Sequence, residues 1–261
     1  MKYEYLSNVP LERAVKDYLA FLHERGVTYR TETVATVDAL DRVTAQAVYA
    51  RVCAPHYNAC AMDGVALDAA ATFGATETTP VTLAEALFTR VDTGDPLPEG
   101  CNAVVMIEDC VETDGGITLY SAAAPWQHVR QIGEDVAAGD MILPSYRIIE
   151  PAVMGAMLAG GVLRVEVLSK PRVGIIPTGD EIVAPREQPA KGEVMEFNSA
   201  IFSGMLRRWG AEPVVYPIVP DAFEAISASL NRAAEECDAV LLCAGTSAGR
   251  DDDTAAVIRA Q

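Results

Sequence analysis

Residues 172–181 read RVGIIPTGDE, an apolar run with the pattern of a buried strand that breaks into a glycine and two acids. Two later stretches, VVYPIVPD at 214–221 and DAVLLCAGTSAGRDDD at 238–253, repeat this change. If the three strands are parallel neighbours, their acidic ends gather at one edge of a sheet, the edge where open α/β sheets bind ligands. The acids concerned are Asp180, Glu181, Asp221, Asp251, Asp252 and Asp253.

The segments between the three runs predict the parallel order, because each is long enough for a helical crossover. Residues 198–212 predict a helix with Asn198 or Ser199 as its cap. Its apolar stripe consists of Ile201, Met205, Leu206 and Trp209. Residues 221–237 predict a second helix with Asp221 as its cap and the stripe Phe223, Ile226, Leu230 and Ala233. The order β-α-β-α-β, followed by a loop and a helix, therefore covers residues 168–261.

Composition limits the classes of protein that this chain can belong to. The net charge of −17, from 37 acidic and 20 basic residues, argues against nucleic acid or an anionic membrane as a partner. No signal peptide and no bilayer-spanning apolar run is recognisable. The six cysteines lack metal-finger spacing, which indicates free thiols in a reducing cytoplasm.

The N-terminal half changes character twice. Residues 8–26 predict a helix with Asn8 or Ser7 as cap, Pro10 in the first turn and a stop at Gly26. A second, shorter helical stretch is expected over residues 37–48. From there to about residue 130, short runs rich in Val, Thr, Ile and Leu are broken by Gly, Pro and Asp, the pattern of an all-β domain.

Residues 131–167 predict a turn, a strand, a small-residue helix and a further strand. The β segment is therefore expected to be an insertion. Three domains follow: a linking domain of residues 1–52 plus 131–167, an inserted β domain of residues 53–130, and an α/β domain of residues 168–261.

Two loop motifs lie in the β segment. In NACAMDGVAL (58–67), Asp63 and Gly64 read most simply as a turn that starts a strand. In VDTGDPLPEGCNAVV (91–105), Thr93 and Asp95 can equally form local side-chain turns. Taken singly, neither motif identifies a function.

Taken together, seven motifs resemble a known family in the same order along the chain. They are NACAMDGVAL, DTGDPLPEGCNAVVMIED, VRQIGEDVAAGD, PRVGIIPTGDEIV, NSAIFSGMLRRWGAE, IVPDAFEAI and CAGTSAGRDD. This series is similar to the molybdopterin molybdenumtransferases, the family of MoeA and the gephyrin E domain. The resemblance implies an elongated, multidomain α+β and α/β protein. Its parts would be a linking domain, an inserted all-β domain and a doubly wound, molybdopterin-binding (MogA-like) α/β domain, here incomplete.

The resemblance also implies an activity. An enzyme of molybdenum cofactor synthesis would use Mg²⁺ to insert molybdate into adenylylated molybdopterin and release AMP. Family members are homodimers whose site lies between the α/β domain of one subunit and the β domain of the other. A molybdopterin adenylyltransferase is a further expected partner.

The resemblance assigns roles to particular residues of this sequence. The implied catalytic residues are Asp63, Thr93, Asp135 and Glu181. The implied substrate-binding residues are Arg130, Thr178, Gly179, Asp180, Gly245, Thr246, Ser247 and Gly249. The implied magnesium ligands are Glu181, Asp221 and Asp252, oxygen donors of the kind that this ion prefers. Loop 244–249 would cradle an anion with its backbone amides at a helix N-terminus.

Simpler roles stay open for several of these residues. Asp221 and any of the three acids at 251–253 can cap a helix, and Arg130 can form an ordinary surface ion pair. Two departures from the family also matter. The sequence ends at Gln261, before the last strands and a Lys-Pro-Gly-Lys-Pro type loop, and it has GTSAG where GGVSVG is commoner.

The chain alone is therefore expected to be C-terminally truncated and inactive or weak. The alternative functions are a non-catalytic molybdopterin-binding or scaffolding module and a molybdate-responsive regulator. The opening YLSNVPL and the AGTSAGRDD variant resemble a subgroup that can carry a fused periplasmic-binding-protein-like domain.

Overall fold

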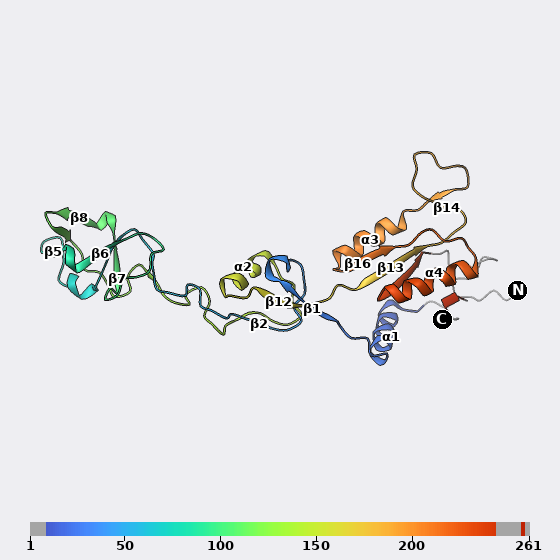
Figure 1. Ribbon diagram of the computed structural model, residues 1–261, viewed down its shortest axis with the longest axis horizontal. Coiled ribbons are helices and arrows are strands. Elements are labelled where there is room, and N and C mark those ends of the chain that lie inside the picture. Colours follow the sequence, from blue (N-terminus) through green and yellow to red (C-terminus); the bar gives the residue numbers. More distant parts are fainter. Residues whose placement is uncertain (1–8, 244–256, 259–261) are drawn as a thin grey trace. The chain divides into compact units, whose positions relative to one another are not determined.

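The computed structural model describes residues 9–243 and 257–258 and shows the mixed α/β content that the sequence predicts (Figure 1). The chain divides into two compact units, one of Glu32–Val167 and one of Met1–Thr31 with Leu168–Gln261. Among the described residues, no helix combines the length and the apolar character needed to cross a bilayer.

A parallel sheet lies at the centre of the second unit, as predicted. Its middle strand is β13 (Arg172–Pro177), which pairs in parallel with β16 (Glu212–Val215) and with β17 (Ala239–Cys243). Strand β16 begins two residues before the predicted apolar run and ends earlier. The chain stays beside β13 beyond β16, because the Val219 amide donates to the Pro177 carbonyl at 2.9 Å.

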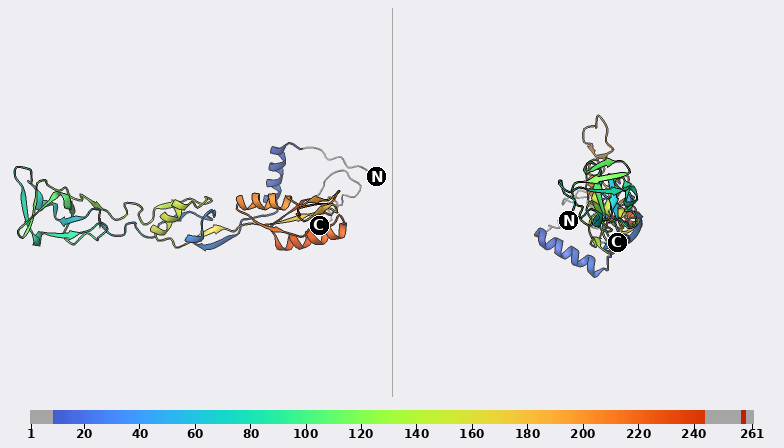
Figure 2. Two further views of the ribbon diagram at one scale, coloured as in Figure 1. Left: turned by 90° about the horizontal axis from the view of Figure 1, so that it is seen from above. Right: turned by 90° about the vertical axis from the view of Figure 1, so that its left-hand side faces the viewer.

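Helices α3 (Asn198–Arg208) and α4 (Phe223–Glu236) cover opposite faces of this sheet (Figure 2). The apolar stripe of α4 faces the sheet as predicted, with Ile226 1% exposed and Ala233 fully buried. The apolar runs of the strands and the helical spacing of residues 221–237 therefore predicted the parallel sheet and α4 correctly.

The orientation predicted for α3 is wrong. Ile201, Met205 and Trp209 are 50%, 39% and 69% exposed, while Ser199 and Ser203 are buried. Leu206, the fourth residue of the predicted stripe, is half-buried and forms a row with Phe202 that lies one residue, or about 100°, round the helix from the other three. The buried residues of α3 are instead the serines Ser199 and Ser203. Helical spacing alone does not decide which side of the helix faces the sheet.

The predicted helix caps are also wrong where the structure describes them. The N-cap positions of α3 and α4 are Phe197 and Ala222, and neither makes a side-chain cap. At α3, the Glu196 carboxylate accepts the Ser199 amide at 2.8 Å. At α4, the Asp221 amide donates to the Asp180 carboxylate at 3.2 Å. The N-cap position of α4 thus lies one residue after the predicted Asp221.

Helix α1 (Leu11–Glu24) forms where the sequence predicts it and ends before Gly26, whose φ is +66°. Its N-cap position is Pro10, not the predicted Asn8 or Ser7, and both of those residues lie outside the described part of the chain. The division into units groups residues up to Thr31 with the α/β domain, whereas the sequence assigned them to the linking domain.

The helix predicted over residues 37–48 is absent from the structure. Only a 3₁₀ turn, η1 (Thr36–Asp38), forms there, and Asp41 has a φ of +60°. The backbone instead bonds to distant segments: the buried Thr44 hydroxyl donates to Pro144, and the Ala45 amide donates to Glu166. These tertiary bonds replace the local i to i+4 bonds of a helix.

The unit Glu32–Val167 contains separate apolar clusters. One joins residues 34–48 to residues 142–167, where α2 (Pro151–Ala159) packs with β2 (Val48–Tyr49), β11 (Met141–Leu143), β1 (Thr31–Ala35) and β12 (Arg164–Leu168). Two further clusters lie entirely between residues 60 and 129. The predicted insertion is consistent with this separation, and its boundaries stay a prediction.

Two three-stranded antiparallel sheets build residues 64–119. In the first, β4 (Gly64–Leu67) lies between β6 (Phe88–Val91) and β7 (Ala103–Met106). In the second, β9 (Gly116–Leu119) lies between β5 (Val81–Ala84) and β8 (Cys110–Thr113). The 3₁₀ turns η2 (Ala69–Thr72), η3 (Glu85–Leu87) and η4 (Ile107–Asp109) connect the strands.

Gly64 is required by a close approach between neighbouring strands. A Cβ atom at this position would lie 2.0 Å from the Val105 carbonyl oxygen, a backbone atom that cannot rotate away. The glycine after Asp63 is therefore a packing requirement of the sheet, beyond the turn that the sequence suggested.

Candidate functional site

A short strand organises the loops that carry the predicted residues of the unit Glu32–Val167. Strand β3 (Ala59–Cys60) pairs with β10 (Val129–Arg130) on one side. On its other side, the Gly94 amide donates to the Cys60 carbonyl and the Cys60 amide to the Asp95 carbonyl, both at 2.8 Å. Three of the sequence motifs therefore meet at one strand.

Asp63 and Thr93 form the first pair. The Thr93 amide and hydroxyl both donate to Asp63 Oδ1, at 2.6 and 2.7 Å. These two hydrogen bonds, the backbone one first, hold the pKa of the Asp63 carboxyl below its usual value. Asp63 is exposed and ionised, and Thr93 fixes its orientation.

Of the two local turns considered for the second motif, only the one at Asp95 forms. Its carboxylate accepts the Asp92 amide at 2.9 Å, and its own amide donates to the Asp92 carbonyl. The Thr93 hydroxyl leaves the turn to bind Asp63, thirty residues away in sequence. Thr93 thus joins the two motifs instead of closing a local turn.

Arg130 and Asp135 form the second pair. Arg130 Nη2 lies 2.7 and 2.8 Å from the two Asp135 oxygens, and Arg130 Nε lies 3.6 Å from Glu134. The hydrogen bond to Asp135 raises the pKa of the Arg130 guanidinium above its usual value. Because both side chains are about half exposed, solvent screens the pair and it contributes little to stability.

The other predicted group lies at the carboxyl edge of the parallel sheet. Thr178 bridges to Val219, the Gly179 amide donates to the Val219 carbonyl at 3.1 Å, and the Thr178 amide donates to the Cys243 carbonyl at 3.1 Å. The ends of all three strands therefore meet, as predicted. The hydrogen bond from the Asp221 amide to Asp180 brings these two acids together.

Gly179 shapes the turn that presents Glu181. Its φ is +141°, and a Cβ atom there would lie 2.5 Å from a carbon of Ile182. Beyond the turn, β14 (Ile182–Val183) pairs in parallel with β15 (Val194–Met195). Within the described residues, the Glu181 carboxylate accepts no hydrogen bond and forms no ion pair.

Five predicted residues lie outside the described part of the chain: Gly245, Thr246, Ser247, Gly249 and Asp252. Within the described ranges, no three His, Cys, Asp or Glu side chains are close enough to form a metal site by themselves. The predicted ligand set of Glu181, Asp221 and Asp252 therefore stays a prediction.

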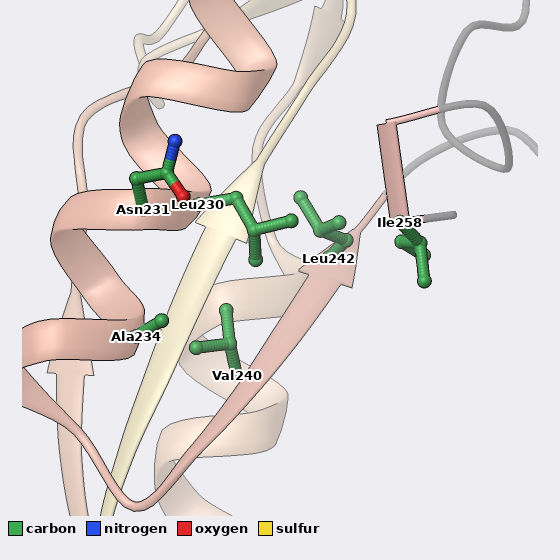
Figure 3. Close-up of a pocket in the computed structure, with 6 residues that line it drawn as sticks. All are labelled: Leu230, Asn231, Ala234, Val240, Leu242 and Ile258. Carbon is green, nitrogen blue, oxygen red and sulfur yellow. The ribbon is translucent and has the colours of Figure 1, made fainter. Parts of the chain in front are cut away.

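An apolar pocket of about 280 Å³ opens between α4, β17 and Ile258 (Figure 3). The described residues that line it are Leu230, Asn231, Ala234, Val240, Leu242 and Ile258. None of them carries a charge, so this pocket is unsuited to an anionic ligand. It is distinct from the acidic sheet edge.

Sequence reasoning did not single out the residues that support the loops at β3. The Tyr57 hydroxyl donates to the Gly94 carbonyl at 3.0 Å. Asn58 bonds to segments on both sides of the strand through its backbone and side-chain oxygens. The only signal was the place of Asn58 at the start of the first motif.

Known families match the chain over most of its length. Residues 9–161 match the MoeA N-terminal region, domains I and II, and residues 174–261 match a family described as "Probable molybdopterin binding domain". The fold and these matches define a class, that of proteins that join a MoeA N-terminal region to an α/β domain of the molybdopterin-binding type. The chain belongs to the MoeA family.

Individual relatives agree with this membership. Molybdopterin molybdenumtransferase 2 of Mycobacterium tuberculosis is 33% identical over 91% of this chain. A Methanocaldococcus jannaschii protein named for molybdopterin biosynthesis is 34% identical over 96% of it. A crystal structure of the molybdopterin biosynthesis MoeA protein of Pyrococcus horikoshii matches 90% of the chain with a TM-score of 0.78 and 30% identity.

The chain is shorter than these relatives. It spans 67% of the M. jannaschii protein, 62% of the M. tuberculosis protein and 66% of the P. horikoshii chain. The activity, substrates and partners of the whole protein are therefore matters for proposal.

Proposed function

We propose that the protein inserts molybdenum from molybdate into adenylylated molybdopterin and releases AMP in a magnesium-dependent step. Membership of the MoeA family supports the reaction class. The observation that carries the proposal to this chain is the acidic sheet edge, where the Glu181 carboxylate has no partner among the described residues and follows Asp180, which accepts the Asp221 amide.

The donor set suits Mg²⁺, because carboxylate oxygens are the ligands that this ion takes from proteins. Glu181 and Asp221, with Asp252 from outside the described residues, would hold it. When bound, Mg²⁺ would neutralise charge on the phosphate or molybdate oxygens. A bound cation would also reduce the electrostatic repulsion between a chain of net charge −17 and its anionic substrates.

The remaining residues would orient the substrates. The Arg130 guanidinium, held by Asp135, offers a fixed positive charge to an anionic group. Asp63, held by Thr93, would close the site from a second subunit, which makes a homodimer part of the proposal. No side-chain nucleophile is needed, because positioning and charge neutralisation are sufficient for displacement at phosphorus.

The test is molybdenum insertion by the intact gene product. AMP release and molybdenum bound per dithiolene are measured with and without Mg²⁺, for the wild type and for Glu181→Ala. The variant should lose about 10²-fold or more in rate, the scale of a lost electrostatic contact to the transition state. Glu187→Ala, an exposed glutamate in the following loop, is the matched control and should retain the rate. Equal rates in the two variants would contradict the role of Glu181.

The same assay separates the alternatives. Tight binding of adenylylated molybdopterin without AMP release would favour a non-catalytic binding or scaffolding module. A molybdate-responsive regulator would bind molybdate alone. A cytoplasmic location and a molybdopterin adenylyltransferase as the supplier of substrate belong to the same proposal.

A further inference from the structure

Asn58 lies between the two loops that carry the predicted residues of the unit Glu32–Val167. Its backbone carbonyl accepts the Leu97 amide at 2.9 Å, next to the turn that holds Thr93. Its side-chain Oδ1 accepts the Ile132 amide at 3.1 Å, inside the loop from Arg130 to Asp135. One residue therefore bonds to both loops: its backbone to Leu97, 39 positions away in sequence, and its side chain to Ile132, 74 positions away.

The next residue explains why Asn58 can reach both sides. Ala59 is paired with Arg130 on one side and forms a bridge with Pro96 on the other. Asn58 thus stands at the end of a strand that has a loop on each flank. Its backbone continues the pairing toward residue 97, and its side chain bonds across to the opposite loop.

The loop 131–135 is also attached to the segment just before β3, where the Asp135 amide donates to the Ala54 carbonyl at 3.0 Å. Its own turn is closed by the Glu134 amide to the Gln131 carbonyl, and Gly133 donates to Pro55. The Asn58 side chain holds the Ile132 amide, in the middle of this loop, at the start of β3, the strand that is also bonded to the Thr93 turn. Without this bond, Arg130 keeps its backbone pairing with Ala59, but the loop from Arg130 to Asp135 loses one of its attachments and is less fixed relative to the Asp63–Thr93 pair.

We infer that Asn58 is a positioning residue: it holds the Arg130 loop at a fixed place relative to the Thr93 loop. It need not touch the substrate. Its effect on activity rests on the proposed function, whereas its effect on the loop does not. Misplacing a substrate-orienting group by about 1 Å can cost on the order of 10²-fold in rate.

The test compares two isosteric variants of Asn58 in the intact gene product. Asn58→Leu removes the acceptor, and Asn58→Asp retains it. The Ile132 amide should exchange with solvent roughly two- to tenfold faster in Asn58→Leu, as for the loss of one hydrogen bond, and near the wild-type rate in Asn58→Asp. For adenylylated molybdopterin, Asn58→Leu should lower kcat/KM by about tenfold or more, and Asn58→Asp should restore most of it.

Asn102→Leu is the matched control for a purely structural asparagine. Asn102 also bonds through its side chain, to the Ala69 amide at 2.7 Å and to Asp68 at 2.9 Å, but at the opposite end of strand β7 from the Asp63 turn. The Asn102→Leu variant should have a lower melting temperature and an unchanged kcat/KM.

The outcomes separate the two proposals. Unchanged Ile132 exchange in Asn58→Leu overturns the inference whatever the activity. Normal kcat/KM in Asn58→Leu, with a strong loss in Asp63→Asn, overturns the positioning role and leaves the proposed function standing. Normal activity in both Asp63→Asn and Glu181→Ala refutes the proposed function, and amide exchange then still decides whether Asn58 fixes the loop.

Discussion

Glu181 at the parallel sheet edge differs from Asp63 and Asp135 in how the chain engages its carboxylate. In the unit Glu32–Val167, Asp63 and Asp135 are each held by donors from the chain, Thr93 and Arg130. At the parallel sheet edge, the Glu181 carboxylate binds no described residue. An acid that is held by donors from the chain is suited to orient or to be oriented, whereas an acid that binds no described residue at a strand end is available to a cation. Glu181 therefore predicts different chemistry from Asp63 and Asp135.

The largest effect expected from this difference concerns Mg²⁺ affinity. Loss of a direct ligand should weaken binding at least as much as loss of an outer-shell partner, so Glu181→Gln should lower affinity by about 100-fold. Asp63→Asn and Asp135→Asn should leave it nearly unchanged. Calorimetric titration of the intact gene product with Mg²⁺ measures all three. Equal losses in all three variants would break the comparison.

A smaller effect is expected from Arg130→Met. Removing this oriented charge should weaken binding of adenylylated molybdopterin about tenfold, or roughly 1.4 kcal/mol. The free energy of unfolding should change little, because the ion pair is half exposed and screened by solvent.

Arg90→Met is the matched control for Arg130→Met. Arg90 makes a two-bond pair with Glu112 at 2.7 and 2.9 Å with similar exposure, in the same unit. The Arg90→Met variant should show the same small change in stability and no change in affinity for adenylylated molybdopterin. If both variants bind substrate equally well, Arg130 is an ordinary surface ion pair.

The smallest effect is a change in titration. Thr93→Val removes the hydroxyl donor, so the pKa of Asp63 should rise toward its ordinary value while the backbone bond from residue 93 keeps part of the depression. Carboxyl NMR titration measures it. Because the folded-state pKa is lowered, these bonds stabilise the fold above the ordinary pKa of Asp, and that contribution is lost as pH falls through the lowered value. Thr89→Val, on an exposed strand position, should leave the titration of Asp63 unchanged.

Much of the fold could be predicted from sequence because strands and crossovers have distinct periodicities. The three parallel strands, α4 with its buried stripe, and the all-β character of residues 64–119 were expected, whereas the 3₁₀ turns η3 and η4, which separate neighbouring strands there, were not. Helix α3 carries two apolar rows, and spacing does not say which faces the sheet. The helix predicted over residues 37–48 does not form, because the hydrogen bonds of this stretch go to residues about a hundred positions away, such as Pro144.

The candidate site divides in the same way. Motif residues such as Asp63 and Thr93 could be named from sequence, and the structure shows them in contact. Their mutual bond could not be derived from local pattern, which gave each a turn of its own. The supporting bond from Asn58 to Ile132 spans 74 positions and leaves no periodic signal.

Gly64 has a consequence for anyone who surveys variants of this protein. Neighbouring positions 63 and 64 should both tolerate little change, but for unrelated causes. A side chain at 64 collides with the Val105 carbonyl and forces the sheet apart, so those variants should be lost from the pool of soluble protein. Variants at 63 should accumulate normally and fail only in function. A survey that measures both protein abundance and activity would therefore distinguish the structural role of position 64 from the functional role of position 63.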